Sequence, residues 1–279
     1  SVADLDGDGD WEVLTAAAIS DGSGGGVEAW FEHDFDPWIE RNGPSDWISW
    51  ELNHADIDGD GVHEIIIADG VYDTNGTRLW SVSLSRFPDT ALQVSTIVVE
   101  ADGDEAAEVV FLGYDSFQVV DGDGTVLHSV STWDLSSDAM YWSNDGLGCA
   151  GDLDGDGEME VVVPSHHLID NETDVQISAW ELDGSLLWSQ TYDIESGLSS
   201  CHVFDFDGDG ADEVLFSDYD ATHVVDGTEG TARMTFPAYY PKQNRATSLI
   251  ATPIVADLDG DGSVEVVIAR NNETVDIPS

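Results

Sequence analysis

The sequence predicts an all-β protein, a β-propeller built from four-stranded antiparallel blades. Three observations lead to this prediction: an acidic nonapeptide recurs six times, a β-branched run follows each copy, and a second turn-and-strand pattern follows in most repeats. Four short strands in a unit of about 50 residues are typical of a propeller blade. We expect one domain over residues 1–279, with six or seven blades and repeats at approximately 1–46, 47–92, 93–144, 145–196, 197–248 and, in part, 249–279.

The acidic nonapeptides align without gaps, and their starts are separated by 52, 44, 52, 53 and 52 residues. Such regular spacing indicates a repeat architecture, because a β-sandwich does not need it. The copies are residues 4–12 (DLDGDGDWE), 56–64 (DIDGDGVHE), 100–108 (EADGDEAAE), 152–160 (DLDGDGEME), 205–213 (DFDGDGADE) and 257–265 (DLDGDGSVE).

Apolar runs on both sides of the nonapeptides predict that each one connects two strands of a hairpin. Residues 161–163 (VVV) follow one copy and residues 254–256 (IVA) precede another. Short β-branched runs of this kind are typical of buried strands. Tight-turn pairs such as Asp183-Gly184 then predict a second hairpin. Residues 121–124 (DGDG) lack a third acid and a closing glutamate, so we interpret them as a hairpin turn only.

Each nonapeptide has the donor set of a calcium site. In residues 152–160, carboxylates stand at loop positions 1, 3, 5 and 9, and Gly157 can adopt the positive φ that a sharp turn needs. Calcium prefers six to eight oxygen ligands and tolerates irregular geometry, whereas magnesium demands a stricter octahedron. Solvated turns without an ion are the alternative, but clustered carboxylates repel one another, and six copies in register disfavour it.

We therefore expect up to six bound calcium ions, with side-chain ligands at positions 1, 3, 5 and 9 and a backbone carbonyl at position 7. The third loop is expected to be the weakest, because it begins with Glu100 and has Glu105 where the others have glycine. The expected ligand residues are Asp4, Asp6, Asp8, Asp10 and Glu12; Asp56, Asp58, Asp60, Val62 and Glu64; Glu100, Asp102, Asp104, Ala106 and Glu108; Asp152, Asp154, Asp156, Glu158 and Glu160; Asp205, Asp207, Asp209, Ala211 and Glu213; and Asp257, Asp259, Asp261, Ser263 and Glu265.

The charge balance excludes several partners. There are 58 Asp and Glu residues against 7 Lys and Arg residues, a formal net charge of −51. Such a surface repels phosphate backbones and anionic lipids, so we expect neither nucleic-acid binding nor membrane insertion. A saline or calcium-rich setting outside the cell, or at its surface, would suit this charge. The sequence begins without methionine or a signal-peptide pattern, and we expect a processed product or part of a longer chain.

The loops with their flanking strands resemble the FG-GAP/VCBS repeats, as in the integrin α-subunit β-propeller and in many bacterial surface proteins. The DxDGDGxxE core carries this resemblance along the whole chain, whereas literal Phe-Gly and Gly-Ala-Pro signatures are not evident, which is nearer to the bacterial type. The resemblance implies calcium in each blade, most often a closed ring of seven blades, and a role in adhesion or surface assembly.

Cys149 and Cys201 precede two successive acidic loops by three and four residues. They occupy nearly equivalent places in adjacent repeats, so a disulfide is geometrically feasible, and we expect one in an extracellular protein. Two buried free thiols are the alternative.

The function expected from the sequence is a non-enzymatic calcium-binding module for adhesion or self-assembly. The partial last repeat leaves sheet edges that could accept a strand from another chain in a fibre. A carbohydrate-binding or polysaccharide-degrading propeller is one alternative, and a scaffold domain of a larger surface protein is another. No Ser/His/Asp order, phosphate loop or zinc pattern stands out, and we interpret His166-His167 as loop residues. The residues expected in longer connections, where they could contact a glycan or a protein, are Trp38, Trp47, Trp50, Trp133, Tyr141 and Trp142.

Overall fold

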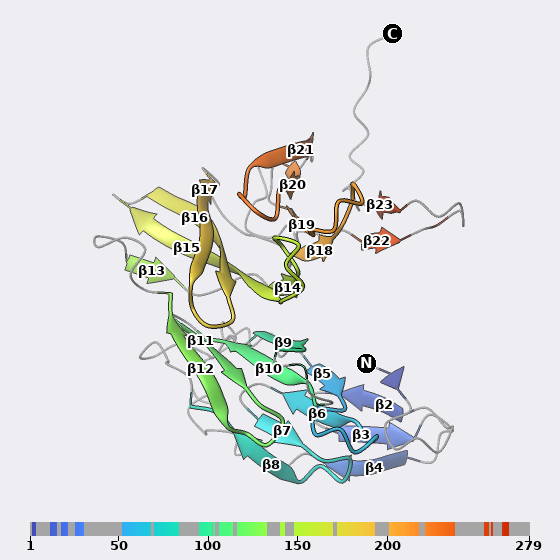
Figure 1. Ribbon diagram of the computed structural model, residues 1–279. Helices are drawn as coiled ribbons and strands as arrows, with labels where there is room; N and C mark the ends of the chain where they lie inside the picture. The colour runs from blue at the N-terminus through green and yellow to red at the C-terminus, as the bar shows by residue number, and fades with distance from the viewer. Residues whose placement is uncertain are drawn as a thin grey trace. The chain divides into compact units, whose positions relative to one another are not determined.

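All elements of the described chain are β-strands that pair in antiparallel sheets (Figure 1). Within these residues no helix is long and apolar enough to cross a membrane. The chain forms two compact units, residues 1–144 with 181–185 and residues 145–180 with 186–279. The computed structural model describes residues 2–3, 12–15, 18–21, 26–30, 52–67, 70–83, 95–101, 103, 106–113, 116–132, 140–142, 148–169, 172–192, 201–217, 221–237, 254–256, 258 and 264–267.

The first unit contains three four-stranded sheets, each ordered as the chain runs. This is the strand count that the repeat length predicts for a blade. The sheets are β1 (Val2–Ala3), β2 (Glu12–Thr15), β3 (Ala18–Asp21) and β4 (Gly26–Trp30); β5 (Leu52–Ala55), β6 (Glu64–Ile67), β7 (Gly70–Tyr72) and β8 (Arg78–Ser81); and β9 (Ser95–Val99), β10 (Glu108–Leu112), β11 (Ser116–Val120) and β12 (Val126–Ser131).

The remaining described strands form a five-stranded sheet, a four-stranded sheet and a two-stranded hairpin. These strands belong to the second unit except for residues 140–142 and residue 181, which belong to the first. In the five-stranded sheet, β13 and β14 both pair with the long strand β15. The strands are β13 (Met140–Trp142), β14 (Cys149–Gly151), β15 (Glu160–Ile169), β16 (Glu172–Glu181) and β17 (Leu186–Tyr192); β18 (His202–Phe204), β19 (Glu213–Ser217), β20 (Ala221–Val225) and β21 (Ala232–Pro237); and β22 (Ile254–Ala256) and β23 (Glu265–Val267).

Strands β13 and β15 differ from the sequence-based expectation. Tyr141 and Trp142 were expected in a long connection, but they lie in β13. His166 and His167 were expected in a loop, but they belong to β15, which is ten residues long. Strand β15 pairs with β13 as well as with β14 and β16, and local turn signals do not reveal this further pairing.

The second strands β6, β10 and β19 form the core, as their continuous apolar runs predict, whereas β23 was also predicted to be buried and is partly exposed. Ile65, Ile66 and Ile67 in β6 and all five residues of β10 are buried, and β19 is buried along its whole length. Burial on both faces is typical of strands without polar alternation. The outer strands β8, β12 and β21 are mostly exposed, so the core lies along the inner strands of each sheet.

Neighbouring sheets in each unit are joined by the same contact. Trp80 Nε1 donates a hydrogen bond to the Gly122 carbonyl at 2.9 Å, and Trp188 Nε1 donates to the Gly227 carbonyl in the second unit. A Cβ on Gly122 would lie 1.7 Å from the Ile57 carbonyl oxygen, so the backbone approaches too closely for any side chain. The turn around Gly122 is therefore more than a hairpin turn, because it packs against an acidic loop of the preceding sheet.

A covalent bond adds to these contacts in the second unit. Cys149 and Cys201 form a disulfide with a Cα–Cα distance of 5.5 Å. Both cysteines belong to the same buried cluster as Leu153, Val214 and Phe216. The disulfide therefore links β14 to the residue just before β18, and each of these segments leads into an acidic loop.

Candidate metal centres in the acidic loops

The acidic loops occupy one register position in every sheet. The glutamate at loop position 9 pairs with the residue just before position 1, as in Ala55↔Glu64 and Phe204↔Glu213. The same pairing holds at Glu12, Glu108, Glu160 and Glu265. Six hairpins thus share one strand register at the ends of their acidic loops, which follows from the identical loop lengths.

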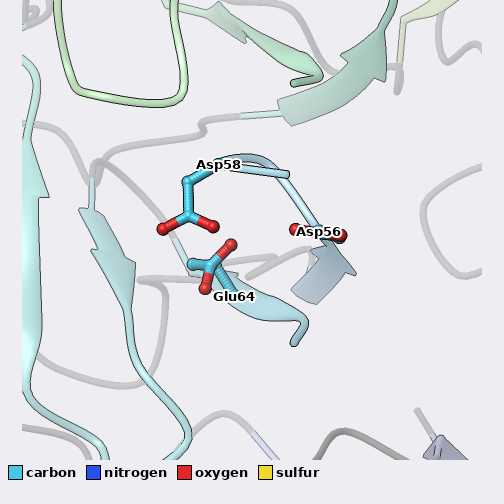
Figure 2. A group of neighbouring side chains, drawn as sticks. All are labelled: Asp56, Asp58 and Glu64. Carbon is cyan, nitrogen blue, oxygen red and sulfur yellow. The ribbon is translucent and has the colours of Figure 1, made fainter. Parts of the chain in front are cut away.

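Three of these loops bring carboxylates together in space. In each group, one ligand atom from each residue lies within 4.8 Å of the others, so each group could hold a metal ion. Figure 2 shows the first group, in which the side chains of Asp58 and Glu64 approach each other while Asp56 lies at the start of the loop. The groups are Asp56, Asp58 and Glu64; Asp152, Asp154 and Glu160; and Asp205, Asp207 and Glu213.

Residues 152–160 show how the sequence folds into this loop. Asp152 accepts backbone hydrogen bonds from Gly155 at 2.8 Å and from Gly157 at 3.0 Å. Asp154 accepts one from Asp156 at 3.1 Å. Gly155 and Gly157 have φ values of 78° and 90°, which side-chain-bearing residues rarely adopt. The glycines therefore let the backbone curl around the carboxylates.

The same bonds recur in the other two groups. Asp56 Oδ2 accepts a hydrogen bond from Gly61 at 2.9 Å, and Asp205 Oδ2 accepts one from Gly210 at 3.1 Å. The backbone N–H at position 7 also donates to the aspartate at position 5 in all three loops. This aspartate (Asp60, Asp156 or Asp209) is therefore held at the loop, although it does not belong to the grouped triplets.

The glutamate at position 9 closes the loop from the following strand. Its Oε2 accepts a hydrogen bond from the N–H of position 2 in all five loops where the structure describes both residues. The distances are 3.1 Å at Ile57, 2.5 Å at Ala101, 2.6 Å at Leu153, 2.8 Å at Phe206 and 2.8 Å at Leu258.

Four of these glutamates are buried, with exposed fractions of 6% for Glu64, 0% for Glu108, 0% for Glu160 and 1% for Glu213. A buried carboxylate is costly unless its charge is compensated, and hard oxygen ligands of this kind suit a hard divalent cation. The donor chemistry of the described loops therefore fits such an ion.

The third loop keeps part of the pattern with a longer acid at position 1. Glu100 Oε1 accepts a hydrogen bond from Gly103 at 2.7 Å, which matches the bond that Asp152 accepts from Gly155. Gly103 has a φ of 80°. Glu105, on which the expectation of a weaker site depends, lies outside the described residues with Asp102 and Asp104, so that expectation stays a prediction.

The first and sixth loops lie largely outside the described residues. Glu12 is placed by its strand, and Glu265 is placed by its bond to Leu258. The remaining expected ligands of these loops stay predictions, namely Asp4, Asp6, Asp8, Asp10, Asp257, Asp259, Asp261 and Ser263.

Three carboxylates of the second and fifth loops have raised pKa values. Burial raises the pKa of Glu64, a hydrogen bond from Ile57 opposes this, and the three aspartates of the same loop raise it again, to about 7 from an ordinary value of 4.5. Burial is also the main cause that raises the pKa of Glu213 and Asp212. A cation bound beside Glu64 or Glu213 would therefore favour the ionised form of that glutamate.

This shift predicts how stability depends on pH in protein stripped of divalent ions. The folded-state pKa of Glu64 lies above its unfolded value, so the folded state binds more protons and the free energy of unfolding falls as the pH rises from about 4.5 to about 7. Glu64→Gln should make this fall shallower in urea denaturation at pH 5 and pH 7. Glu158→Gln, at an exposed side chain, is the control. Equal slopes for wild type and Glu64→Gln would contradict the prediction.

Sequence reasoning missed Arg233, which lies in β21 beside the fifth loop. Its Nη1 forms ion pairs with Asp207 and with Glu213, the latter at 2.9 Å. The sequence has only 7 Lys and Arg residues, so each of them is a candidate ion-pair partner for an acidic loop. This scarcity is the signal that could have pointed to Arg233.

The family comparison then bears on these loops. Residues 205–268 match the FG-GAP-like repeat. The match begins at the first residue of the fifth nonapeptide and includes the sixth. It confirms, over these residues, the resemblance to FG-GAP repeats that the sequence indicated. No curated protein sequence gives a significant match.

Solved structures share the fold at low sequence identity. The V. cholerae biofilm matrix protein Bap1 is similar with a TM-score of 0.65 and 16% identity, over 98% of this chain and 65% of Bap1. The rhamnogalacturonan lyase YesW is similar with a TM-score of 0.53 and 18% identity, over 80% of this chain and 46% of the lyase. This chain thus spans less than two thirds of either protein, and at these identities the likeness concerns the fold alone.

Proposed function

We propose that this protein is a calcium-stabilised extracellular β-propeller without enzymatic activity, which serves in adhesion or self-assembly. The recurring closure of the acidic loops supports the calcium part most directly. In five loops the position-9 glutamate accepts the position-2 N–H, and in three of them grouped carboxylates face one small volume. Calcium suits these loops better than magnesium, because several carboxylates and a backbone carbonyl supply many oxygen ligands in an irregular shell.

The propeller part of the proposal rests on the repeated sheets. Each described four-stranded sheet is a simple antiparallel meander, and the same tryptophan-to-turn hydrogen bond joins neighbouring sheets in each unit. Six such repeats, extended by a seventh or closed by themselves, would form a ring of blades. The predicted ligand at position 7, a backbone carbonyl, belongs to the same proposal.

The extracellular role has three supports. A biofilm matrix protein shares the fold, a disulfide is typical of an oxidising compartment, and the charge of −51 suits a saline medium. Partners would be further copies of the chain or another surface protein. Electron microscopy of the purified protein with and without calcium tests self-assembly, and a field of uniform single particles in both conditions would contradict it.

A matched pair of variants tests calcium binding at one loop. Glu160 is buried and closes its loop, whereas Glu158 is exposed in the same loop, and both lose one charge on conversion to glutamine. In isothermal titration with calcium, Glu160→Gln should weaken one site by at least about tenfold, because it removes a buried charged ligand. Glu158→Gln should change the affinity by no more than about twofold, because its charge is solvated. Equal effects of the two variants, or no calcium binding by the wild type, would contradict the proposal.

Carbohydrate binding or cleavage is the second candidate function. The rhamnogalacturonan lyases YesW and YesX share the fold, with TM-scores of 0.53 and 0.51. A glycan array and an assay for release of unsaturated sugars from pectic polysaccharides would test this candidate. Binding to an acidic polysaccharide would additionally require calcium bridges, since the protein itself is strongly negative.

A further inference from the structure

Arg233 places its guanidinium among the candidate metal ligands of the fifth loop. Its Nη1 forms ion pairs with Asp207 and Glu213, and both of these residues belong to the grouped triplet of that loop. Its Nη2 lies 4.0 Å from Asp209 Oδ2, the carboxylate at position 5. A cation carried by the chain thus lies where three of the loop's carboxylates converge.

Asp226 anchors this guanidinium from the other side. Its Oδ2 accepts hydrogen bonds from Arg233 Nε at 3.0 Å and from Nη2 at 2.6 Å. Its Oδ1 accepts bonds from the backbone of Thr228 and Glu229, so the β20–β21 turn holds the anchor itself. A guanidinium is always charged in proteins, so Arg233 acts as a fixed cation. Even when Nη1 leaves the loop, the two bonds to Asp226 can keep the arginine nearby.

Five sheets have a position on their outer strand that is equivalent to the position of Arg233, but different residues occupy it. In each of these sheets the register of the outer hairpin shifts by one residue and leaves one position unpaired on the outer strand. The residues at this position are Glu28, Leu79, Leu127, Leu187 and Arg233. Three sheets therefore carry leucine where the fifth loop has an arginine.

We propose that Arg233 is a tethered cation that competes with calcium for the loop 205–213, which makes this loop a weaker and less calcium-dependent site than the loop 152–160. The inference rests on the proposed calcium binding. A divalent ion that takes Asp207 and Glu213 as ligands must displace Nη1 from both, and it loses the ion pairs that Arg233 makes there. Without calcium, the same ion pairs neutralise part of the loop and hold its two ends together.

Hydrogen–deuterium exchange of the full chain, followed by mass spectrometry across a calcium titration, resolves the two loops. In the wild type, the calcium midpoint for protection of residues 205–213 should lie about tenfold above that of residues 152–160, as expected for competition with a charge-assisted hydrogen bond to Asp207 and an ion pair with Glu213. Arg233→Leu converts the fifth sheet to the leucine pattern and should lower its midpoint about tenfold, with residues 152–160 unchanged. Leu187→Arg should raise the midpoint of residues 152–160.

A purely structural role of Arg233 would not produce the expected change of sign. In Arg233→Leu, residues 205–213 should exchange faster than in the wild type in chelator but more slowly than in the wild type at intermediate calcium concentration. Arg233→Lys keeps the charge without the forked geometry and should give an intermediate midpoint. Arg78→Leu removes one positive charge next to the equivalent position in another sheet and should leave both loops unchanged.

Failure of the competition by Arg233 can be distinguished from failure of calcium binding. If residues 152–160 respond to calcium while Arg233→Leu and Arg233→Lys leave the midpoint of residues 205–213 unchanged, the competition is refuted and calcium binding stands. If neither loop responds to calcium in any variant, the proposed function fails together with this inference.

Discussion

Removal of divalent ions with excess EDTA is expected to lower the midpoint of thermal unfolding by at least about 10 °C. A ligand that binds only the folded state stabilises it by mass action, by about 2.7 kcal/mol for each site at an ion concentration one hundred times its dissociation constant. Three of the described loops bring their carboxylates together, so their contributions add. Differential scanning calorimetry in calcium and in EDTA measures the difference.

The charges within the loops explain why removal of divalent ions should lower the unfolding temperature. Four of the glutamates that close the loops are buried, and the pKa of Glu64 is raised to about 7 by burial and by the aspartates around it. Deprotonation at neutral pH therefore opposes folding until a cation balances the charge. Calcium should also bind more weakly as the pH falls below 7, because protons compete for the same carboxylates.

Screening by salt has to be separated from binding at a site. Sodium chloride at the ionic strength of the calcium buffer weakens the repulsion among the 51 net negative charges but supplies no divalent ion. It should restore only a small part of the lost stability, and magnesium should restore less than calcium. Full recovery in sodium chloride alone would show that general screening, and not bound calcium, stabilises the fold.

Loss of the disulfide between Cys149 and Cys201 is expected to lower the free energy of unfolding by about 4 kcal/mol. The two cysteines are 52 residues apart, so the bond closes a long loop in the unfolded chain and reduces its entropy. It also joins two sheets of the second unit within one buried cluster. Urea denaturation of the double variant Cys149→Ser/Cys201→Ser, in saturating calcium, measures the loss.

A reductant provides the control for this result. Wild-type protein treated with dithiothreitol should unfold at the same urea concentration as the double variant, since both lack the covalent bond. Because Cys149 lies three residues before Asp152, the calcium affinity of the loop 152–160 should also fall in both samples. A double variant as stable as the oxidised wild type would refute the assigned contribution.

Much of the candidate site could be predicted from the sequence, because its geometry is local. The positions of Asp152, Gly157 and Glu160 within nine residues determine the hairpin register and the bonds that close the loop. The apolar runs after each loop likewise predicted buried second strands. Strand β13 and the length of β15 were not predicted, because a pairing between distant segments leaves no periodic signal in either of them.

The sequence by itself determined that acidic loops recur, that each joins two strands of a hairpin, and which carboxylates each loop offers, since all three depend on residues less than ten positions apart. Only the tertiary structure decided that Gly122 packs on the carbonyl of Ile57 and that Arg233 reaches Asp207. These contacts join residues 65 and 26 positions apart, so they depend on how the strands of a sheet align and how sheets pack on one another. No local pattern encodes that arrangement, because it results from burying the apolar faces of several repeats at once.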